Sequence, residues 1–389
     1  MQDKIKRIRQ WMKYGKANPY ALDINLTYAC NLKCKFCNGY QEGVTQAKIK
    51  EIPDSKFLEC VEEAIQIGIK EFHIAGDGEP FMKKNLICQI AALVKNNKRY
   101  GKITTNGTLV DAQTVGTLVQ CEWDAINISI VGSNSRIHDY QVGKNGSFTR
   151  CMNTIKLIND YKKRFKKKYP QIMMATVITN KNMHDLQNII LLAKNLKIQH
   201  VSFEPLNVCY PTVKKLKLSN KQAEDFETIA HNVSHLAYQN EIYTTIKFLK
   251  KTVPVQNSTS IATQSSSFSP NFSPACFQPW YRMVVRPNGD VQPCCNFYNP
   301  DADKFDGYNL HIIWSGKYFS RIRGRISTHQ FYEDCNRCNL WIASETKQIQ
   351  NRLNQNRLMN IGCAIVDFAK YHLPNKVLDF YYFRMSHHE

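Results

Sequence analysis

Strand-like and helix-like segments alternate along the first half of the chain. The strand-like runs, rich in apolar and β-branched residues, cover residues 22–27, 71–75, 101–105, 125–130, 172–178 and 199–204. Helical patterns separate them, and the clearest one, at 55–67, repeats apolar residues such as Phe57 and Val61 at helical spacing. Because helical crossovers join parallel strands, we expect an α/β fold with a parallel sheet, either open or closed into a barrel. Ligands of such folds bind at the carboxyl ends of the strands.

The alternation stops near Pro211. A polar helical pattern follows at about 219–239, and the segment 254–274 is rich in Ser, Pro and Asn, which is typical of a linker or long loop. At the other end, residues 3–16 form a basic amphipathic pattern. We favour a helix packed on the main domain over one that binds a membrane surface or a partner.

Composition excludes several classes of protein. The 389 residues are 43% hydrophobic, which is enough for a core and excludes a mainly disordered chain. We find no uninterrupted apolar run long enough for a transmembrane helix, and no signal peptide, so we expect a cytoplasmic protein. The 52 basic and 32 acidic residues give a net charge of +20, which suits an anionic partner. Because the charge is dispersed, we favour a solvated surface and do not expect nucleic-acid binding.

Cysteine is unusually frequent, with 14 residues. In a cytoplasmic chain of this length, spaced cysteines indicate metal binding or catalysis rather than disulfides. Cys30, Cys34 and Cys37 form a C-x3-C-x2-C group directly after the first expected strand. Three thiolates can hold three irons of a cubane cluster and leave the fourth iron open to a small molecule. The spacing alone also fits zinc or chance.

The loops after the next strands carry residues suited to ligand binding. The second strand ends in A-G-D-G-E-P, the third in T-T-N-G-T and the fourth in I-S-I. Together with the cysteines, and with S-I-V-G-S-N-S-R-I-H-D-Y and G-S-F further on, these motifs resemble the radical S-adenosylmethionine (radical SAM) superfamily over about residues 20–210.

The resemblance implies a partial (β/α)6, TIM-like barrel in which Cys30, Cys34 and Cys37 bind a 4Fe–4S cluster. SAM would chelate its open iron and be reductively cleaved to a 5′-deoxyadenosyl radical, which abstracts a hydrogen from the substrate. The residues expected to contact SAM are Phe36, Gly78, Glu79, Asn106 and Ser129.

One position departs from the family pattern. Val142 stands where relatives often carry an arginine that reaches the SAM carboxylate. We expect Lys144 or Arg136 to replace that contact, unless it is absent.

A second group of cysteines comprises Cys276, Cys294, Cys335 and Cys338. The apolar run 281–286 and the turn at Asn288–Gly289 predict a β-hairpin between the first two. Four thiolates suit either zinc or a second 4Fe–4S cluster. The pattern from P-W through P-N-G-D-V-Q-P-C to C-N-R-C resembles the SPASM domain or its shortened relative, the twitch domain, which implies the cluster.

Two features of this second group bear on the number of auxiliary clusters and on the identity of one ligand. Ser344 and Lys347 stand where full SPASM domains place further cysteines, so we expect a single auxiliary cluster. Cys295 is adjacent to Cys294 and is an alternative ligand, and we favour Cys294 from its spacing after Gly289.

The expected organisation is an N-terminal helix, the barrel, a helix with a linker, a small α+β auxiliary-cluster domain (a hairpin plus a helix) and a helical tail. Their boundaries are 1–19, 20–215, 216–275, 276–344 and 345–389.

The implied function is a radical SAM oxidoreductase that dehydrogenates or crosslinks a peptide or small metabolite, with an auxiliary 4Fe–4S cluster assisting. A redox-neutral epimerase or isomerase is the alternative, and it needs a hydrogen donor such as Cys209. A basic zinc protein that binds nucleic acid is a remote alternative, because it leaves G-D-G-E-P and T-N-G-T unexplained. The chemistry also implies a flavodoxin or ferredoxin as electron donor.

Overall fold

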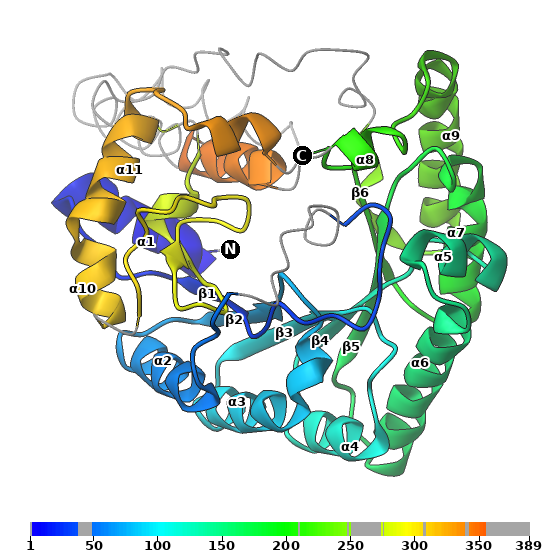
Figure 1. The fold of residues 1–389 in the computed structure, drawn as a ribbon, viewed down its shortest axis with the longest axis horizontal. Coiled ribbons are helices and arrows are strands. Elements are labelled where there is room, and N and C mark those ends of the chain that lie inside the picture. Colours follow the sequence, from blue (N-terminus) through cyan, green and yellow to red (C-terminus); the bar gives the residue numbers. More distant parts are fainter. Residues whose placement is uncertain are drawn as a thin grey trace, which may run out of the picture.

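The computed structural model describes residues 2–37, 49–208, 211–246, 249, 274, 276–305, 309–338 and 342–354. Within these residues, nine strands form one sheet in the order β7-β6-β5-β4-β3-β2-β1-β8-β9 (Figure 1). The strands are β1 (Ala21–Asn25), β2 (Glu71–Ala75), β3 (Tyr100–Thr105), β4 (Ala125–Ser129), β5 (Gln171–Val177), β6 (His200–Glu204), β7 (Tyr243–Thr244), β8 (Arg282–Val285) and β9 (Val291–Gln292). Neighbouring strands are parallel except β8 and β9.

The sheet is the wall of a partial barrel, with helices along its outer face (Figure 1). These helices are α2 (Asp54–Gln66), α3 (Lys84–Asn96), α4 (Ala112–Gln120), α6 (Ser147–Arg164), α7 (Leu186–Asn195) and α9 (Asn220–Gln239). Side chains alternate across each strand, so Ile24, Phe72 and Ile103 lie in the core under the helices. The opposite, inner face carries polar side chains such as Asp23 and Lys102.

Local signals explain where many of these helices begin. The side chain of Asp111 accepts a hydrogen bond from Thr114 N at the start of α4. A capping box of Ser219 and Gln222 starts α9. Further helices are α5 (Ser135–Val142), α8 (Pro211–Lys214) and the short 3-10 turns at Pro80–Lys83 and Met183–Asp185. The six strands predicted from the sequence are confirmed, and the partial-barrel α/β fold with them.

The C-terminal cysteine unit continues the same sheet. Strand β8 pairs in parallel with β1, with Val285 opposite Ile24, and the predicted hairpin of β8 and β9 turns at Gly289 with φ of +86°. Helices α10 (Leu310–Ser315) and α11 (Lys317–Ser327) and the 3-10 turns at Gln278–Trp280 and Glu333–Arg337 complete this unit. The sequence pattern predicted the hairpin but not its place beside β1.

The N-terminal helix α1 (Gln2–Tyr14) lies against this C-terminal unit. Its Ile5 and Ile8 share a buried cluster with Phe277 and Tyr281 and with Ile349 of helix 342–354. The amphipathic pattern of α1 is therefore used for packing inside the protein. Helix 342–354 also runs across the domain boundary that we expected at 344/345.

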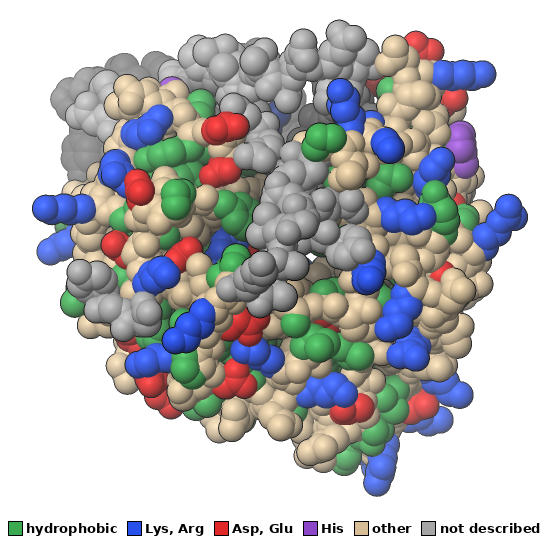
Figure 2. All heavy atoms as spheres, viewed as in Figure 1, with side chains coloured by type: hydrophobic (Ala, Val, Ile, Leu, Met, Phe, Trp, Pro, Cys, Tyr) green, Lys and Arg blue, Asp and Glu red, His purple; other side chains and the backbone are tan. Residues whose placement is uncertain are grey.

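Basic side chains are scattered over the face of the molecule shown in Figure 2. As we expected from the dispersed lysines of the sequence, these side chains form no single patch on this face. Among the helices described, none has the length and apolar character needed to cross a membrane.

Candidate active site

The first cysteine loop follows β1 directly. Leu32 N donates to Cys30 Sγ at 3.5 Å, and Cys37 N donates to Cys34 O at 3.1 Å, so the loop folds back on itself. Burial raises the pKa of the Cys34 thiol, and the neighbouring thiols of Cys37 and Cys30 raise it further. The loop therefore holds Cys34 near the thiols of Cys30 and Cys37.

Gly78, in the loop after β2, packs against the backbone of this cysteine loop. A Cβ on Gly78 would lie 2.3 Å from Ala29 O and 2.7 Å from Thr27 O. The adjacent Glu79 N donates to Ala29 O at 2.9 Å. Only glycine permits this approach, and Gly78 can offer a ligand nothing but its backbone groups.

The carboxyl group of Glu79 braces two loops. Its Oε1 accepts from Thr105 Oγ1 at 2.6 Å and from Phe81 N at 3.1 Å, and its Oε2 accepts from Asn106 N at 2.7 Å. Burial raises the pKa of Glu79, and these hydrogen bonds lower it. A carboxylate has about four acceptor positions, so Oε2 retains capacity for one further donor.

Asn106 reaches the cysteine loop from the end of β3. Its Nδ2 donates to Asn31 Oδ1 at 2.9 Å and lies 4.0 Å from Cys30 Sγ. Its Oδ1 accepts from the backbone N of Thr108 at 2.9 Å, which fixes the orientation of the amide. Ser129 is the last residue of β4 and is half-buried.

Phe36 packs with Leu32 and the buried Val142, the residue that replaces the expected arginine. Lys144 Nζ donates to the carbonyl of Asn31 at 3.3 Å, so a cation does reach this loop. Arg136 is exposed at the start of α5. Of the two basic residues considered, Lys144 is therefore the one in contact with the cysteine loop.

The segments that carry the second group of cysteines pack together, because Tyr298 N donates to Asp334 Oδ2 at 3.1 Å and the Phe297 and Tyr332 rings lie 4.9 Å apart. Burial raises the pKa of the Cys294 thiol, and the neighbouring thiols of Cys295, Cys276 and Cys338 raise it further. Burial and the thiol of Cys335 raise the pKa of Cys276, hydrogen bonds from Gln278 and Thr346 lower it, and the net value is about 12. The ends of the β8–β9 hairpin and the 3-10 turn of Glu333–Arg337 carry these cysteines, and helix 342–354 contributes Thr346 beside Cys276.

Cys295 lies in a different environment from Cys294. Burial and Asp23 raise the pKa of Cys295, Arg282 and Arg286 lower it, and the net value is about 11. Asp23 lies on β1, whereas Arg282 and Arg286 lie on and directly after β8, and the first thiol neighbour of Cys294 is Cys295 itself. Because the thiol of Cys295 also acts on Cys338, both cysteines lie near the group, and Cys294 stays the prediction made from its spacing after Gly289.

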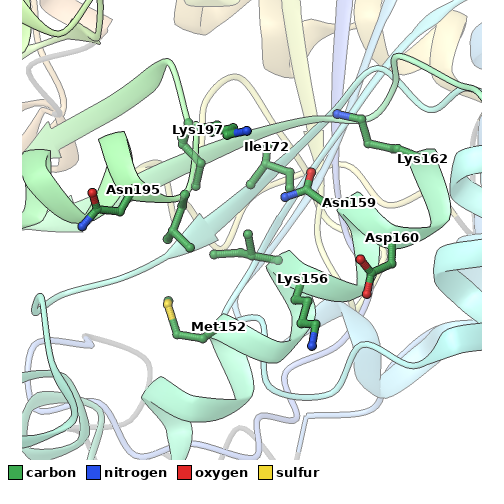
Figure 3. A pocket seen from close by; sticks show the side chains of 11 residues that line it. Met152, Lys156, Asn159, Asp160, Lys162, Ile172, Asn195 and Lys197 are labelled. Atoms are coloured by element: carbon green, nitrogen blue, oxygen red, sulfur yellow. The ribbon is translucent and has the colours of Figure 1, made fainter.

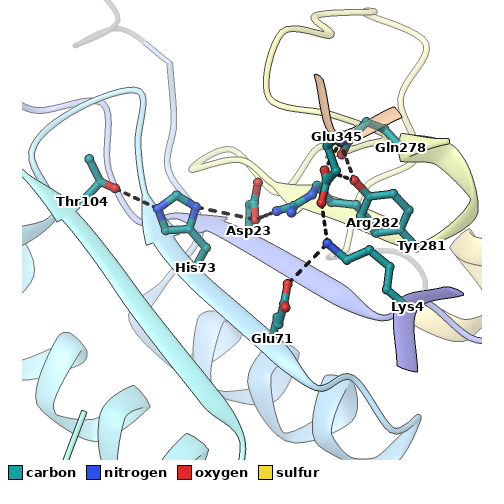
Figure 4. Close-up of polar contacts among 9 residues, drawn as sticks. All are labelled: Lys4, Asp23, Glu71, His73, Thr104, Gln278, Tyr281, Arg282 and Glu345. Carbon is teal, nitrogen blue, oxygen red and sulfur yellow. Dashed lines mark hydrogen bonds and ion pairs between the residues drawn. The ribbon is translucent and has the colours of Figure 1, made fainter. Parts of the chain in front are cut away.

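The inner face of the sheet carries a polar network (Figure 4). Arg282 Nη1 donates to Asp23 Oδ1, and His73 Nδ1 lies 3.8 Å from the same oxygen. His73 Nε2 is 2.9 Å from Thr104 Oγ1. Burial lowers the pKa of His73 well below its usual value, and Lys102 and Arg282 lower it further, so the ring is neutral at pH 7.

Three further polar side chains line this face. Burial lowers the pKa of Lys102, while Asp23 and Glu204 raise it, and burial raises the pKa of Glu204 to about 7. Asn127 Oδ1 is buried without a hydrogen-bond partner among the residues described. These groups could bind polar parts of a substrate.

A hollow of about 430 Å³ lies elsewhere, between α6, the start of β5 and the turn before β6 (Figure 3). Met152, Lys156 and Ile172 are among its lining residues. It opens near the amino ends of the strands, whereas the cysteine loops follow their carboxyl ends. We therefore do not regard it as part of the site.

Two family models match the chain. The radical SAM superfamily matches residues 24–193, and SPASM, an iron–sulfur cluster-binding domain, matches residues 276–339. The protein is a radical SAM enzyme with a C-terminal SPASM domain. Radical SAM domains bind SAM and a 4Fe–4S cluster, and SPASM domains bind auxiliary iron–sulfur clusters, so this enzyme uses both kinds of cofactor.

Curated relatives match the radical SAM enzyme over most of its length. It is 24% identical over 335 residues to the Bacillus subtilis antilisterial bacteriocin subtilosin biosynthesis protein AlbA, covering 82% of this chain and 65% of AlbA. It is 23% identical to the PqqA peptide cyclase of Granulibacter bethesdensis, covering 82% of this chain and 79% of the cyclase. The chain thus spans slightly under two thirds of AlbA.

Solved structures share the fold. Streptococcus suis SuiB bound to the precursor peptide SuiA aligns with a TM-score of 0.63 at 19% identity, over 83% of this chain and 71% of SuiB. Native anSMEcpe with bound AdoMet aligns with a TM-score of 0.59 at 16% identity, over 88% of this chain and 99% of anSMEcpe.

The cysteine groups of this radical SAM enzyme fit the cofactors of its family. Thiolates are the usual ligands of iron–sulfur clusters, and the chain supplies one group of three and one group of four. Across the described ranges, no group of three or more His, Cys, Asp or Glu side chains is arranged to hold a single metal ion. A cubane differs from such a site because each thiolate binds its own iron. Cys209, the considered hydrogen donor, lies outside the described residues.

Proposed function

We propose that this enzyme oxidatively modifies a peptide, by dehydrogenation or crosslinking, in a SAM-dependent radical reaction. The observation that carries the proposal is the packing of the segment after Cys294 against the turn that carries Cys335: Tyr298 N donates to Asp334 Oδ2 at 3.1 Å, and the Phe297 and Tyr332 rings lie 4.9 Å apart. Cys276 and Cys294 flank the hairpin of β8 and β9, and β8 is the parallel neighbour of the strand that leads into Cys30. A second redox centre beside the radical site suits a reaction in which the substrate loses hydrogen and electrons.

In this proposal Cys30, Cys34 and Cys37 hold the SAM-binding cluster, and the second group holds one auxiliary 4Fe–4S cluster. When bound, these cofactors supply the radical that removes a substrate hydrogen and an acceptor for the remaining electron. A flavodoxin or ferredoxin is the proposed electron donor.

The chain's own residues orient SAM. The residues proposed to contact it are Phe36, the backbone of Gly78, Glu79, Asn106 and Ser129. Lys144 is the proposed substitute for the missing arginine, because it already reaches the cysteine loop. Glu79 acts mainly as a brace, since three of its acceptor positions are filled within the protein.

The similarity to AlbA, to PqqA peptide cyclases and to SuiB, which was solved with a precursor peptide, supports a peptide as substrate. The inner face supports it as well, because buried Asn127 Oδ1 lacks a partner among the described residues. A peptide backbone supplies both donors and acceptors for such groups. Glu204 and Lys102 add a carboxyl and an amine to the same wall.

The cofactor assignment is tested by iron content after anaerobic reconstitution. We expect about eight irons per wild-type chain, and about four when Cys30, Cys34 and Cys37 are replaced by Ala. Replacing the second group of cysteines should also leave about four. Zinc without iron in the wild type would refute the radical reaction and support the zinc-protein alternative.

The reaction class is tested with a synthetic peptide library, SAM and reduced flavodoxin in deuterated water. We expect products that have lost two hydrogen atoms, formed together with 5′-deoxyadenosine. Products of unchanged composition that carry one solvent deuterium would instead support an epimerase. SAM cleavage with modification of small metabolites, and of no peptide, would overturn the peptide assignment.

A further inference from the structure

A buried ion pair joins two loops that the proposed function assigns to different iron–sulfur sites. Asp77 lies between the two glycines of the loop after β2, and Arg286 directly follows β8. Arg286 Nη1 donates to Asp77 Oδ1 at 2.6 Å, and the two side chains are only 3% and 6% exposed. The partners are 209 residues apart in the sequence.

Arg286 holds the loop of the second cysteine group. Its Nη2 donates to the carbonyl of Cys295 at 2.8 Å and to the carbonyl of Phe297 at 3.1 Å. Phe297 N in turn donates to Cys294 O at 3.2 Å. The guanidinium group therefore fixes the backbone that directly follows the proposed ligand Cys294.

Asp77 belongs to the side of the SAM-binding cluster. It is followed by Gly78, which packs against Ala29 immediately before Cys30. Asn25 Nδ2, at the end of β1, donates to Asp77 Oδ2 at 3.0 Å. A continuous series of direct contacts thus leads from the first cysteine loop through Asp77 to the second.

Tyr298 covers this ion pair. Its hydroxyl donates to Asp77 Oδ1 at 3.0 Å, and the Arg286 guanidinium lies 3.6 Å from the centre of its ring. Because both side chains are almost fully buried, water and salt screen their charges only weakly, and their electric fields reach neighbouring groups.

We propose that Asp77 and Arg286 are positioning residues that lock the second cysteine loop onto the SAM side and set the reduction potential of the auxiliary cluster. This inference rests on the proposed function, because it requires a cluster at Cys294. A buried cation nearby favours the reduced cluster, which carries more negative charge, and a buried anion favours the oxidised cluster. Loss of the Arg286 charge should therefore lower the potential, and loss of the Asp77 charge should raise it.

The experiment uses the full chain with Cys30, Cys34 and Cys37 replaced by Ala, so that only the auxiliary cluster contributes. Midpoint potentials are measured by EPR-monitored redox titration for Arg286→Gln, Asp77→Asn and the double variant. We expect a shift to lower potential for Arg286→Gln, a shift to higher potential for Asp77→Asn, and an intermediate value for the double variant. Arg321→Gln, which breaks an exposed ion pair on α11, should leave the potential unchanged.

Shifts of both single variants in the same direction would indicate mere loosening of the loop and would overturn the electrostatic role. Unchanged potentials in both single variants would also overturn the electrostatic role. Urea unfolding of the cluster-free chain gives an independent readout, because the double variant should lose less stability than the sum of the two single variants if the charges are coupled. If the variant that lacks only Cys30, Cys34 and Cys37 binds no iron, the proposed function itself is refuted. That outcome is distinct from unchanged potentials, which refute only the role of Asp77 and Arg286.

Discussion

Gly78→Ala is the sharpest test of how the SAM-side loops are packed. The new Cβ would lie 2.3 Å from Ala29 O and 2.7 Å from both Thr27 O and the carbonyl carbon of Tyr28. All three atoms belong to the backbone, so no flexible side chain can move aside. The loop after β2 and the first cysteine loop must therefore separate by several tenths of an ångström.

The cost has two parts. Overpacking of this kind destabilises a protein by about 1–3 kcal/mol, which we expect in the free energy of unfolding of the cluster-free chain. A displacement approaching about 1 Å at a reacting centre can lower a rate by about 100-fold. We therefore expect 5′-deoxyadenosine formation by Gly78→Ala to fall by up to about 100-fold when the iron content matches that of the wild type.

Gly324→Ala is the matched control, because Gly324 lies inside α11 with no atom within 4 Å of its added Cβ. It should gain about 0.5–1 kcal/mol of stability and leave SAM cleavage unchanged. Unfolding is followed by circular dichroism in urea, and 5′-deoxyadenosine is measured by chromatography. A Gly78→Ala variant as stable and as active as the wild type would refute the packing argument.

Three further predictions concern the second cysteine group, the inner face and helix α1. Cys294→Ser should remove the auxiliary iron and Cys295→Ser should retain it, as measured by iron analysis; the reverse pattern would exchange the two assignments. Because burial raises the pKa of Glu204 from 4.5 to about 7, the folded protein binds a proton that the unfolded chain releases, and stability falls as pH rises between these values. This change in the free energy of unfolding is at most about 3 kcal/mol, and Glu204→Gln should remove it. If the variant and the wild type show the same pH profile of urea unfolding, the prediction is wrong. Lys4 Nζ lies 2.5 Å from Glu345 Oε1, so Lys4→Met should cost about 3–5 kcal/mol by leaving Glu345 buried without its partner, and a smaller cost in Lys4→Met/Glu345→Gln would confirm the coupling.

Several residues of the site were not predictable from their sequence neighbourhood. Asp77 and Arg286 each stand in a recognised motif, G-D-G-E-P and R-P-N-G-D, but nothing local indicates that they pair. The only available signal was a charged residue in a tight loop that glycines otherwise dominate. Likewise, the sequence suggested that Glu79 contacts SAM, whereas the structure shows its carboxyl group engaged mainly with Thr105, Phe81 and Asn106.

The sequence by itself determined the local elements and the chemistry they carry. The alternation of strand and helix patterns, the caps of α4 and α9, the turn at Gly289 and the spacings of both cysteine groups all depend on residues a few positions apart. Sequence periodicity reports such short-range relations directly. This is why the strands, the main helices and the two thiol groups could be predicted.

Only the tertiary structure decided how these elements meet. The pairing of β8 with β1, the ion pair of Asp77 with Arg286 and the contact of Lys4 with Glu345 each join distant parts of the chain. Such contacts follow from the order of strands in the sheet and from the packing around it. A local pattern does not encode that order, because a buried strand reads the same whichever neighbour it has.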